Sequence, residues 1–145
     1  MSNNDPDVRR GGGCLCGAIR YETVGEPTTV GHCHCTLCQR ASGAAFVTWA
    51  VFPAGAFAFT KGAPKIIRSS PKAERAFCGL CGTPLWFRYT EGPADIDVTA
   101  ATFDNPSEFV PQYAIWTSSR LPWLELEGHL PSYPDDGPDF SPYKR

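Results

Sequence analysis

Short apolar or alternating segments recur along the chain, and residues that favour turns bound most of them. The segments are AIRYETV (18–24), AAFVTWAVF (44–52), AFAFT (56–60), KIIRS (65–69), PLWFRYT (84–90), DIDVTAAT (95–102) and YAIWT (113–117). This pattern is typical of many short strands. We therefore predict one all-β domain built from short antiparallel sheets.

Two segments have helical rather than strand character. TLCQRAS (36–42) predicts a short helix, with Thr36 as the candidate N-cap. NPSEF (105–109) predicts a single helical turn capped by Asn105 or Ser107. We expect no longer helix in this chain.

The two ends of the chain differ in composition from its middle. Residues 1–10 are polar, and we expect them to be disordered. The stretch from Pro131 onward is rich in proline and acidic residues, so we place the domain at residues 11–133 and an extended tail at 134–145. The N-terminus lacks a secretory signal, and no apolar run approaches the roughly 20 residues of a membrane span. A cytoplasmic protein is expected.

Composition narrows the class of partner. The chain has 145 residues, 42% of them hydrophobic, which is enough for a real core. Charged residues make up 19%, and the net charge is −2. There is no basic surplus to bind nucleic-acid phosphates, so nucleic-acid binding is disfavoured. The oligomeric state is not predicted.

Seven cysteines point to metal binding. An odd number cannot all pair in disulfides, and a reducing compartment disfavours disulfides in general. Cys14 and Cys16 are separated by one residue, as are Cys33 and Cys35. This spacing is awkward for an internal bridge but natural for chelating one ion.

The cysteines fall into three groups that can be divided between two zinc ions. CGLC, followed by Gly82, resembles a zinc knuckle, and a structural zinc takes four thiolates. One group of four consists of Cys14, Cys16, Cys78 and Cys81. The remaining cysteines are Cys33, Cys35 and Cys38. Three protein ligands and an open position are the arrangement of a catalytic zinc.

The spacing leaves two alternatives to this division. A histidine or a carboxylate closes the three-cysteine site and makes it structural, or Cys78 and Cys81 complete it instead. His32 and His34 share one parity in an extended stretch, and Cys33 and Cys35 share the other. The histidines then point away from the thiols, which favours an all-cysteine ligand set.

The motifs GGCLCGAIRYE (12–22), HCHCTLCQRASGAAF (32–46), RAFCGLCGTPL (75–85) and TFDNPSEFVP (102–111), with the region around Trp123, resemble the glutathione-dependent formaldehyde-activating enzyme family, also called the centromere protein V family. The resemblance runs from about Gly12 to Tyr133. It implies an Mss4-like, zinc-stapled all-β fold. It also implies a structural zinc on the group of four cysteines and a labile zinc on the group of three. One departure is Ala114, where family members often carry a histidine.

The activity implied by the resemblance is S-(hydroxymethyl)glutathione synthase, a carbon–sulfur lyase used in formaldehyde detoxification. Cys33, Cys35 and Cys38 are then the catalytic site, glutathione and an aldehyde are the substrates, and two zinc ions are the cofactors. Arg40 and Arg75 are the expected binding residues for the glutathione carboxylates, while Arg20 and Lys72 are weaker candidates. The alternative function is a non-catalytic zinc module that binds a thiol or a protein partner.

Overall fold

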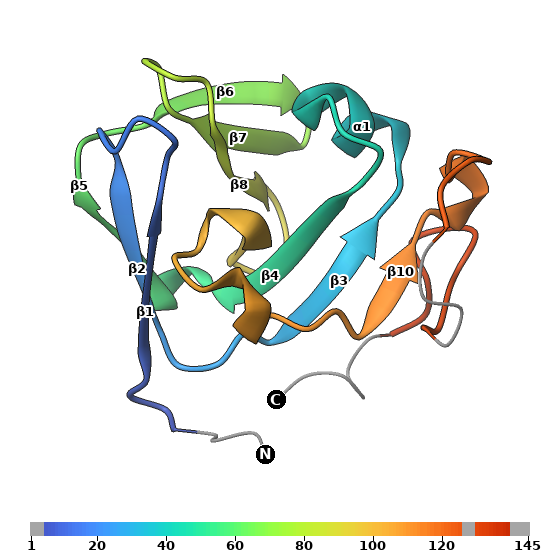
Figure 1. The fold of residues 1–145 in the computed structure, drawn as a ribbon, viewed down its shortest axis with the longest axis horizontal. Coiled ribbons are helices and arrows are strands. Elements are labelled where there is room, and N and C mark those ends of the chain that lie inside the picture. Colours follow the sequence, from blue (N-terminus) through green and yellow to red (C-terminus); the bar gives the residue numbers. More distant parts are fainter. Residues whose placement is uncertain (1–4, 126–129, 140–145) are drawn as a thin grey trace.

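Two sheets build the molecule, and the computed structural model describes residues 5–125 and 130–139 (Figure 1). The smaller sheet has the order β1-β2-β5 and consists of β1 (Arg9–Gly13), β2 (Arg20–Val24) and β5 (Phe57–Lys61). The larger sheet has the order β10-β3-β4-β9-β8-β7-β6. Its strands are β3 (Thr29–Cys33), β4 (Val47–Pro53), β6 (Lys65–Ser70), β7 (Ala73–Phe77), β8 (Pro84–Tyr89), β9 (Asp95–Thr99) and β10 (Tyr113–Ile115).

The all-β class predicted from the sequence is confirmed. All strand pairs are antiparallel except β10 with β3, which run parallel. β1, β3 and β7 were not among the segments that the apolar pattern picked out. β1 has the sequence RRGGG, which carries no apolar alternation, and it begins two residues before the predicted domain start at residue 11.

The helical segments are short. α1 (Thr36–Ser42) has the bounds predicted from the sequence, but its N-cap is Cys35 and not Thr36. Gly43 ends α1 in the left-handed conformation, with φ of 68°. Four 3₁₀ turns complete the described structure: η1 (Ala54–Ala56), η2 (Ala100–Thr102), η3 (Pro106–Glu108) and η4 (Thr117–Ser119). Asn105 occupies the N-cap position of η3 without a side-chain capping bond.

The two faces of the larger sheet have different roles, because side chains alternate along each strand. One row crosses five neighbouring strands through paired residues that are all buried: Val30, Ala50, Val98, Trp86 and Ala76. This face belongs to the main core, which also contains Tyr21 and Phe103. The opposite face carries the residues that line the candidate site.

A glycine in β3, Gly31, allows the ring of Tyr113 on β10 to pack closely against the sheet. A Cβ atom at Gly31 would lie 2.2 Å from Cε2 of Tyr113, on the neighbouring strand β10. Such a contact is far shorter than atoms tolerate, so only glycine lets the Tyr113 ring pack here.

Residues 130–137, of which 134–137 belong to the predicted tail, are hydrogen-bonded to β10 and to the residues that follow it. The N–H of Ala114 donates to Pro131 O at 2.9 Å, and the N–H of Tyr133 donates to Ala114 O at 3.0 Å. The N–H of Trp116 donates to Asp135 O at 2.8 Å. The segment therefore lies along β10 (Figure 1).

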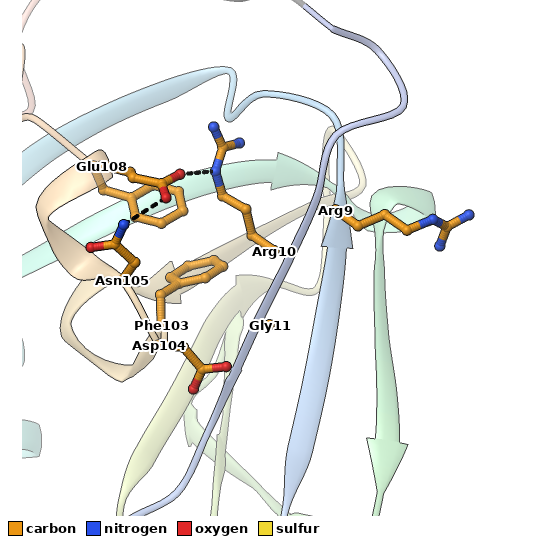
Figure 2. A pocket seen from close by; sticks show the side chains of 8 residues that line it. Arg9, Arg10, Gly11, Phe103, Asp104, Asn105 and Glu108 are labelled. Carbon is orange, nitrogen blue, oxygen red and sulfur yellow. Dashed lines mark hydrogen bonds and ion pairs between the residues drawn. The ribbon is translucent and has the colours of Figure 1, made fainter.

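An ion-pair network ties the N-terminal strand to η3 (Figure 2). Arg10 Nε donates to Glu108 Oε2 at 2.6 Å, and its terminal nitrogen contacts Glu26 at 3.1 Å. Asn105 donates to the same Glu108 carboxylate at 2.7 Å. The charged residues that line this small cavity, about 190 Å³ in volume, all have ion-pair partners: Arg10 pairs with Glu108, Arg9 with Glu22 and Asp104 with Arg20. None of the helices in the described part of the chain has the length and apolar character that a membrane crossing requires.

Candidate metal centres

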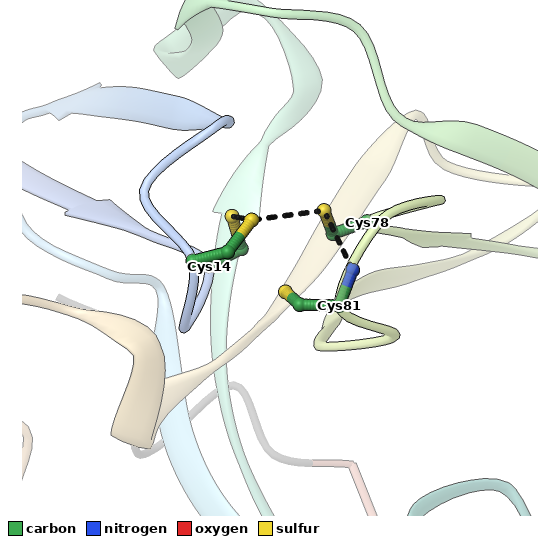
Figure 3. A group of neighbouring side chains, drawn as sticks. Cys14, Cys78 and Cys81 are labelled. Atoms are coloured by element: carbon green, nitrogen blue, oxygen red, sulfur yellow. Dashed lines mark hydrogen bonds between the residues drawn. The ribbon is translucent and has the colours of Figure 1, made fainter.

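Four cysteines from two hairpins form the first cluster. Cys14 and Cys16 lie in the loop between β1 and β2, and Cys78 and Cys81 lie in the loop between β7 and β8 (Figure 3). All four Sγ atoms lie within 4.8 Å of one another. The Cys14–Cys16 and Cys16–Cys78 sulfur distances are 3.6 and 3.8 Å. A tetrahedral zinc with bonds of about 2.3 Å sets its sulfurs roughly 3.8 Å apart, so the cluster fits such an ion.

Backbone N–H groups turn toward these sulfurs. Ile19 N–H donates to Cys14 Sγ at 3.3 Å, and Cys81 N–H donates to Cys78 Sγ at 3.5 Å. A hydrogen bond from the Thr83 hydroxyl lowers the pKa of the Cys81 thiol to about 5. These donors stabilise thiolates, which are the form that binds a metal.

The second cluster consists of Cys33, Cys35 and Cys38. Cys33 ends β3, Cys35 caps α1 and Cys38 lies in its first turn. Their Sγ atoms also lie within 4.8 Å of one another. Among residues 5–125 and 130–139, no histidine, aspartate or glutamate joins them at this spacing. The two clusters correspond to the division predicted from the cysteine spacing.

Proton sharing within this cluster favours one thiolate. Hydrogen bonds from Cys33 and Cys38 lower the pKa of Cys35, and the Cys38 N–H donates to Cys35 Sγ at 3.2 Å. The hydrogen bond with Cys35 is the main cause that raises the pKa of Cys33. Binding a metal through all three sulfurs must therefore release protons, so its affinity falls at low pH.

The two histidines lie outside the cluster. His32 Nδ1 is hydrogen-bonded to the Thr48 hydroxyl at 2.8 Å, as expected for a histidine that is not a ligand. His34 is fully buried, and neither of its ring nitrogens has a hydrogen-bond partner among the described residues. Both rings pack against Phe46, at centroid distances of 4.7 and 5.3 Å. Burial lowers the pKa of His34, so the ring is neutral.

A cavity of about 460 Å³ adjoins the three cysteines, which form part of its wall. This volume is typical of small-molecule sites. Aromatic side chains line much of the rest: Trp49, Phe87, Tyr89, Tyr113 and Trp116. Trp49 stands in the apolar run AAFVTWAVF, and that run does not reveal which face of the sheet each residue takes.

Three charged residues also line this cavity. Arg75 lies with its guanidinium 4.9 Å from the centroid of the Phe87 ring. Asp97 and Asp136 contribute carboxyl groups. Arg40, the other arginine predicted to bind substrate, is exposed in the last turn of α1 and does not line the cavity.

Asp97 and Asp136 were missed by sequence reasoning. Asp97 stands between the buried Ile96 and Val98, so alternation along this strand places it on the other face of the sheet. Only the register of β9 within the sheet shows that this face borders the three cysteines. Asp136 lies in the segment that we expected to be a tail.

Ala114 faces away from the cavity. It is 2% exposed and pairs with His32, while its neighbours Tyr113 and Ile115 line the cavity. A histidine at this position would extend from the opposite side of β10. The departure from the family pattern therefore leaves the cavity wall unchanged.

Comparison with known proteins identifies relatives. The family described as glutathione-dependent formaldehyde-activating enzyme matches residues 9–119. An uncharacterized lyase of Schizosaccharomyces pombe is 34% identical over 100 residues, which cover 63% of this chain and 66% of that protein. A Halomonas elongata protein, provisionally named a glutathione-dependent formaldehyde-activating enzyme, is 23% identical over 139 residues, covering 86% of this chain and 88% of its own.

A solved structure shares the fold. The crystal structure of a Rhodobacter sphaeroides protein matches with a TM-score of 0.54 and 19% identity. The match covers 84% of this chain and 98% of that one. At this identity the likeness shows the fold alone.

Proposed function

We propose, on the premise that this chain belongs to the glutathione-dependent formaldehyde-activating enzyme family, that it is a zinc-dependent carbon–sulfur lyase acting on the adduct of glutathione and formaldehyde. One observation carries the proposal. The three-cysteine cluster, with no fourth ligand side chain among the described residues, opens into a cavity large enough for a small molecule. The names of the two relatives, a lyase and a formaldehyde-activating enzyme, agree with this class of reaction.

The two clusters take different roles in this proposal. Cys14, Cys16, Cys78 and Cys81 hold a structural zinc, because four thiolates fill a tetrahedral ion. Cys33, Cys35 and Cys38 hold the second zinc. A zinc bound there supplies an open coordination position that takes a substrate thiol in its thiolate form.

The residues around this site position the reactants. In the forward direction a sulfur–carbon bond forms between the thiol and formaldehyde, and the thiol proton ends on the new hydroxyl. Three thiolates leave a bound zinc with net charge −1, which weakens its polarising effect. Alignment of the two reactants therefore supplies most of the acceleration, and the aromatic walls exclude water from them. Arg75 binds a glutathione carboxylate.

Exchange of formaldehyde with glutathione tests the proposal. We expect zinc-loaded protein to accelerate this exchange, followed by NMR exchange spectroscopy. Arg75→Ala should raise KM for glutathione about tenfold, the effect of losing one charged hydrogen bond. Arg40→Ala, a matched control outside the cavity, should leave KM unchanged.

Two outcomes would reject the proposal. If the protein binds two zinc ions but does not accelerate exchange, the alternative of a non-catalytic thiol-binding module is correct. If Arg40→Ala impairs KM as strongly as Arg75→Ala, the substrate does not occupy this cavity.

A further inference from the structure

A row of three cavity residues crosses neighbouring strands. Arg75 on β7 pairs with Phe87 on β8, which pairs with Asp97 on β9. All three line the cavity beside the three cysteines. Because strands are about 4.8 Å apart, the Cα atoms of Arg75 and Asp97 are separated by roughly 10 Å. A cation and a carboxyl group thus flank an aromatic ring.

Neither charged group is paired with an opposite charge in the described part of the chain. Within the described residues, no hydrogen bond or salt bridge joins the Asp97 carboxyl to another side chain, and the same holds for the Arg75 guanidinium. Arg88, on the neighbouring strand β8, instead pairs with Glu74 at 2.7 Å. An unpaired carboxyl in a desolvated position costs stability, so its presence in a cavity points to a ligand that pairs with it.

The environment of Asp97 suits a cation. Burial, followed by the charges of Asp95 and Asp136, raises the pKa of Asp97 to about 7. Burial, followed by nearby carboxyl charges that include Asp97, raises the pKa of Tyr89 and of Tyr113, whose rings line the same cavity. Aromatic faces beside a carboxyl group are the surroundings that bind ammonium groups.

Asp136 is less available than Asp97. Burial raises the pKa of the Asp136 carboxyl, and the nearby Trp116 side chain partly offsets this rise. Trp116 is itself held at φ of 56°, a left-handed conformation that is costly for a bulky residue. The Asp136 carboxyl group thus already has the Trp116 side chain beside it in the cavity wall.

We propose that Asp97 is a specificity-determining residue that binds the ammonium group of the ligand, while Arg75 binds a carboxylate of the same ligand. The site is then built for a thiol that carries an amino-acid zwitterion, such as the γ-glutamyl end of glutathione. This inference rests on the proposed function, because it requires that the three-cysteine site receives the thiol. It adds the residue that recognises the ammonium group and so discriminates among thiols.

Small thiols that differ only in charge test the inference. Calorimetric titration at pH 8 would compare cysteamine, which has an ammonium group, with 3-mercaptopropionate, which has a carboxylate, and with neutral 2-mercaptoethanol. In the zinc-loaded protein, Asp97→Asn should weaken cysteamine binding tenfold or more, the effect of losing one charged hydrogen bond, and leave 2-mercaptoethanol within about twofold. Binding of 3-mercaptopropionate should not weaken. Glu91→Gln is the control, because Glu91 is exposed, does not line the cavity and is not among the charges that act on Asp97, and it should change none of the three affinities.

S-methylglutathione separates the inference from the lyase activity, since it keeps the zwitterion but has no thiol. Binding of S-methylglutathione that weakens in Asp97→Asn supports the subsite even if formaldehyde exchange is absent. Equal weakening of all three thiols would overturn the inference, because Asp97 would then support only the shape of the site. Unchanged cysteamine binding would also overturn it, while leaving the lyase proposal intact. If no thiol and no glutathione derivative binds, both proposals fail.

Discussion

Asp97 combines a titratable group with a half-buried position in the cavity wall, and this should make its effect on stability depend on pH. Its folded-state pKa, about 7, lies above the usual value near 3.9 of an unfolded chain. The folded state therefore holds the proton more tightly, so this stabilising contribution is complete below about pH 3.9. It is lost as pH rises through 7.

Replacing Asp97 by asparagine removes this dependence. We expect the difference in Tm between Asp97→Asn and the unsubstituted protein to be about 6 °C more favourable to the variant at pH 8 than at pH 5.5, which corresponds to roughly 2 kcal/mol for a chain of this size. Differential scanning calorimetry of metal-loaded proteins would measure it, and titration of the metal ligands cancels in the difference. Glu91→Gln, which removes an exposed carboxyl group outside the cavity, should show no such trend. A Tm difference independent of pH would mean that Asp97 stays ionised in the folded state.

At the scale of single residues, the sequence predicted which cysteines lie together better than it predicted the residues that surround them. The cysteines were divided correctly between two clusters, because few side chains can chelate and their spacing limits the combinations. Asp97 was overlooked because a single carboxyl in a strand has no signature of its own. Its role depends on which strands lie beside β9, and the sequence of a single strand does not determine the strand order of the sheet.

At the scale of elements, the two hairpin loops that carry Cys14, Cys16, Cys78 and Cys81 act as one staple. One loop belongs to the smaller sheet and the other to the larger sheet. Cys78 is 1% exposed and belongs to the main core. Loss of a structural metal here would remove a folding contribution on the order of 10 kcal/mol, which exceeds the stability of many domains.

The two clusters should therefore respond differently to the same substitution. Cys78→Ser should yield insoluble or unfolded protein. Cys35→Ser should fold, keep one metal ion per chain and lose activity, since serine also caps helices well and preserves the start of α1. Circular dichroism and metal analysis of both variants would test this division. Equal loss of fold in both variants would contradict it.

The predicted elements failed where a neighbour in space, and not the local sequence, decides the structure. Cys35, and not Thr36, is the N-cap of α1, because its sulfur accepts a hydrogen bond from the Cys38 N–H. The same sulfur also lies close to the other two thiols. Residues 130–137 are polar and rich in proline, yet the free edge of β10 gives their backbone hydrogen-bond partners. Amino-acid composition alone does not reveal that such an edge lies nearby.

At the scale of the whole molecule, the larger sheet separates two environments. Cys14 and Cys78 are packed into the main core, whereas Cys33 and Cys38 form a smaller cluster with Trp49 beside the cavity. The smaller sheet covers only the first face. The main core, which stabilises the fold, and the cavity, which can admit a ligand, therefore lie on opposite faces of the larger sheet.

This separation predicts two stages of metal loss. A chelator at the three-cysteine site can bind the metal through its open position before any protein ligand leaves, whereas at the four-cysteine site a thiolate must dissociate first. Native mass spectrometry during titration with a chelator should show a folded species with one metal before any metal-free species appears. Unfolding, followed by circular dichroism, should accompany only the second loss. Cys16 of the four-cysteine site is exposed, so a chelator can displace it from the metal, and this opposes the predicted order of metal loss. Loss of both metal ions in a single step, or unfolding when the first ion is lost, would contradict this prediction. It would show that the number of protein ligands does not decide which metal ion this protein retains longer.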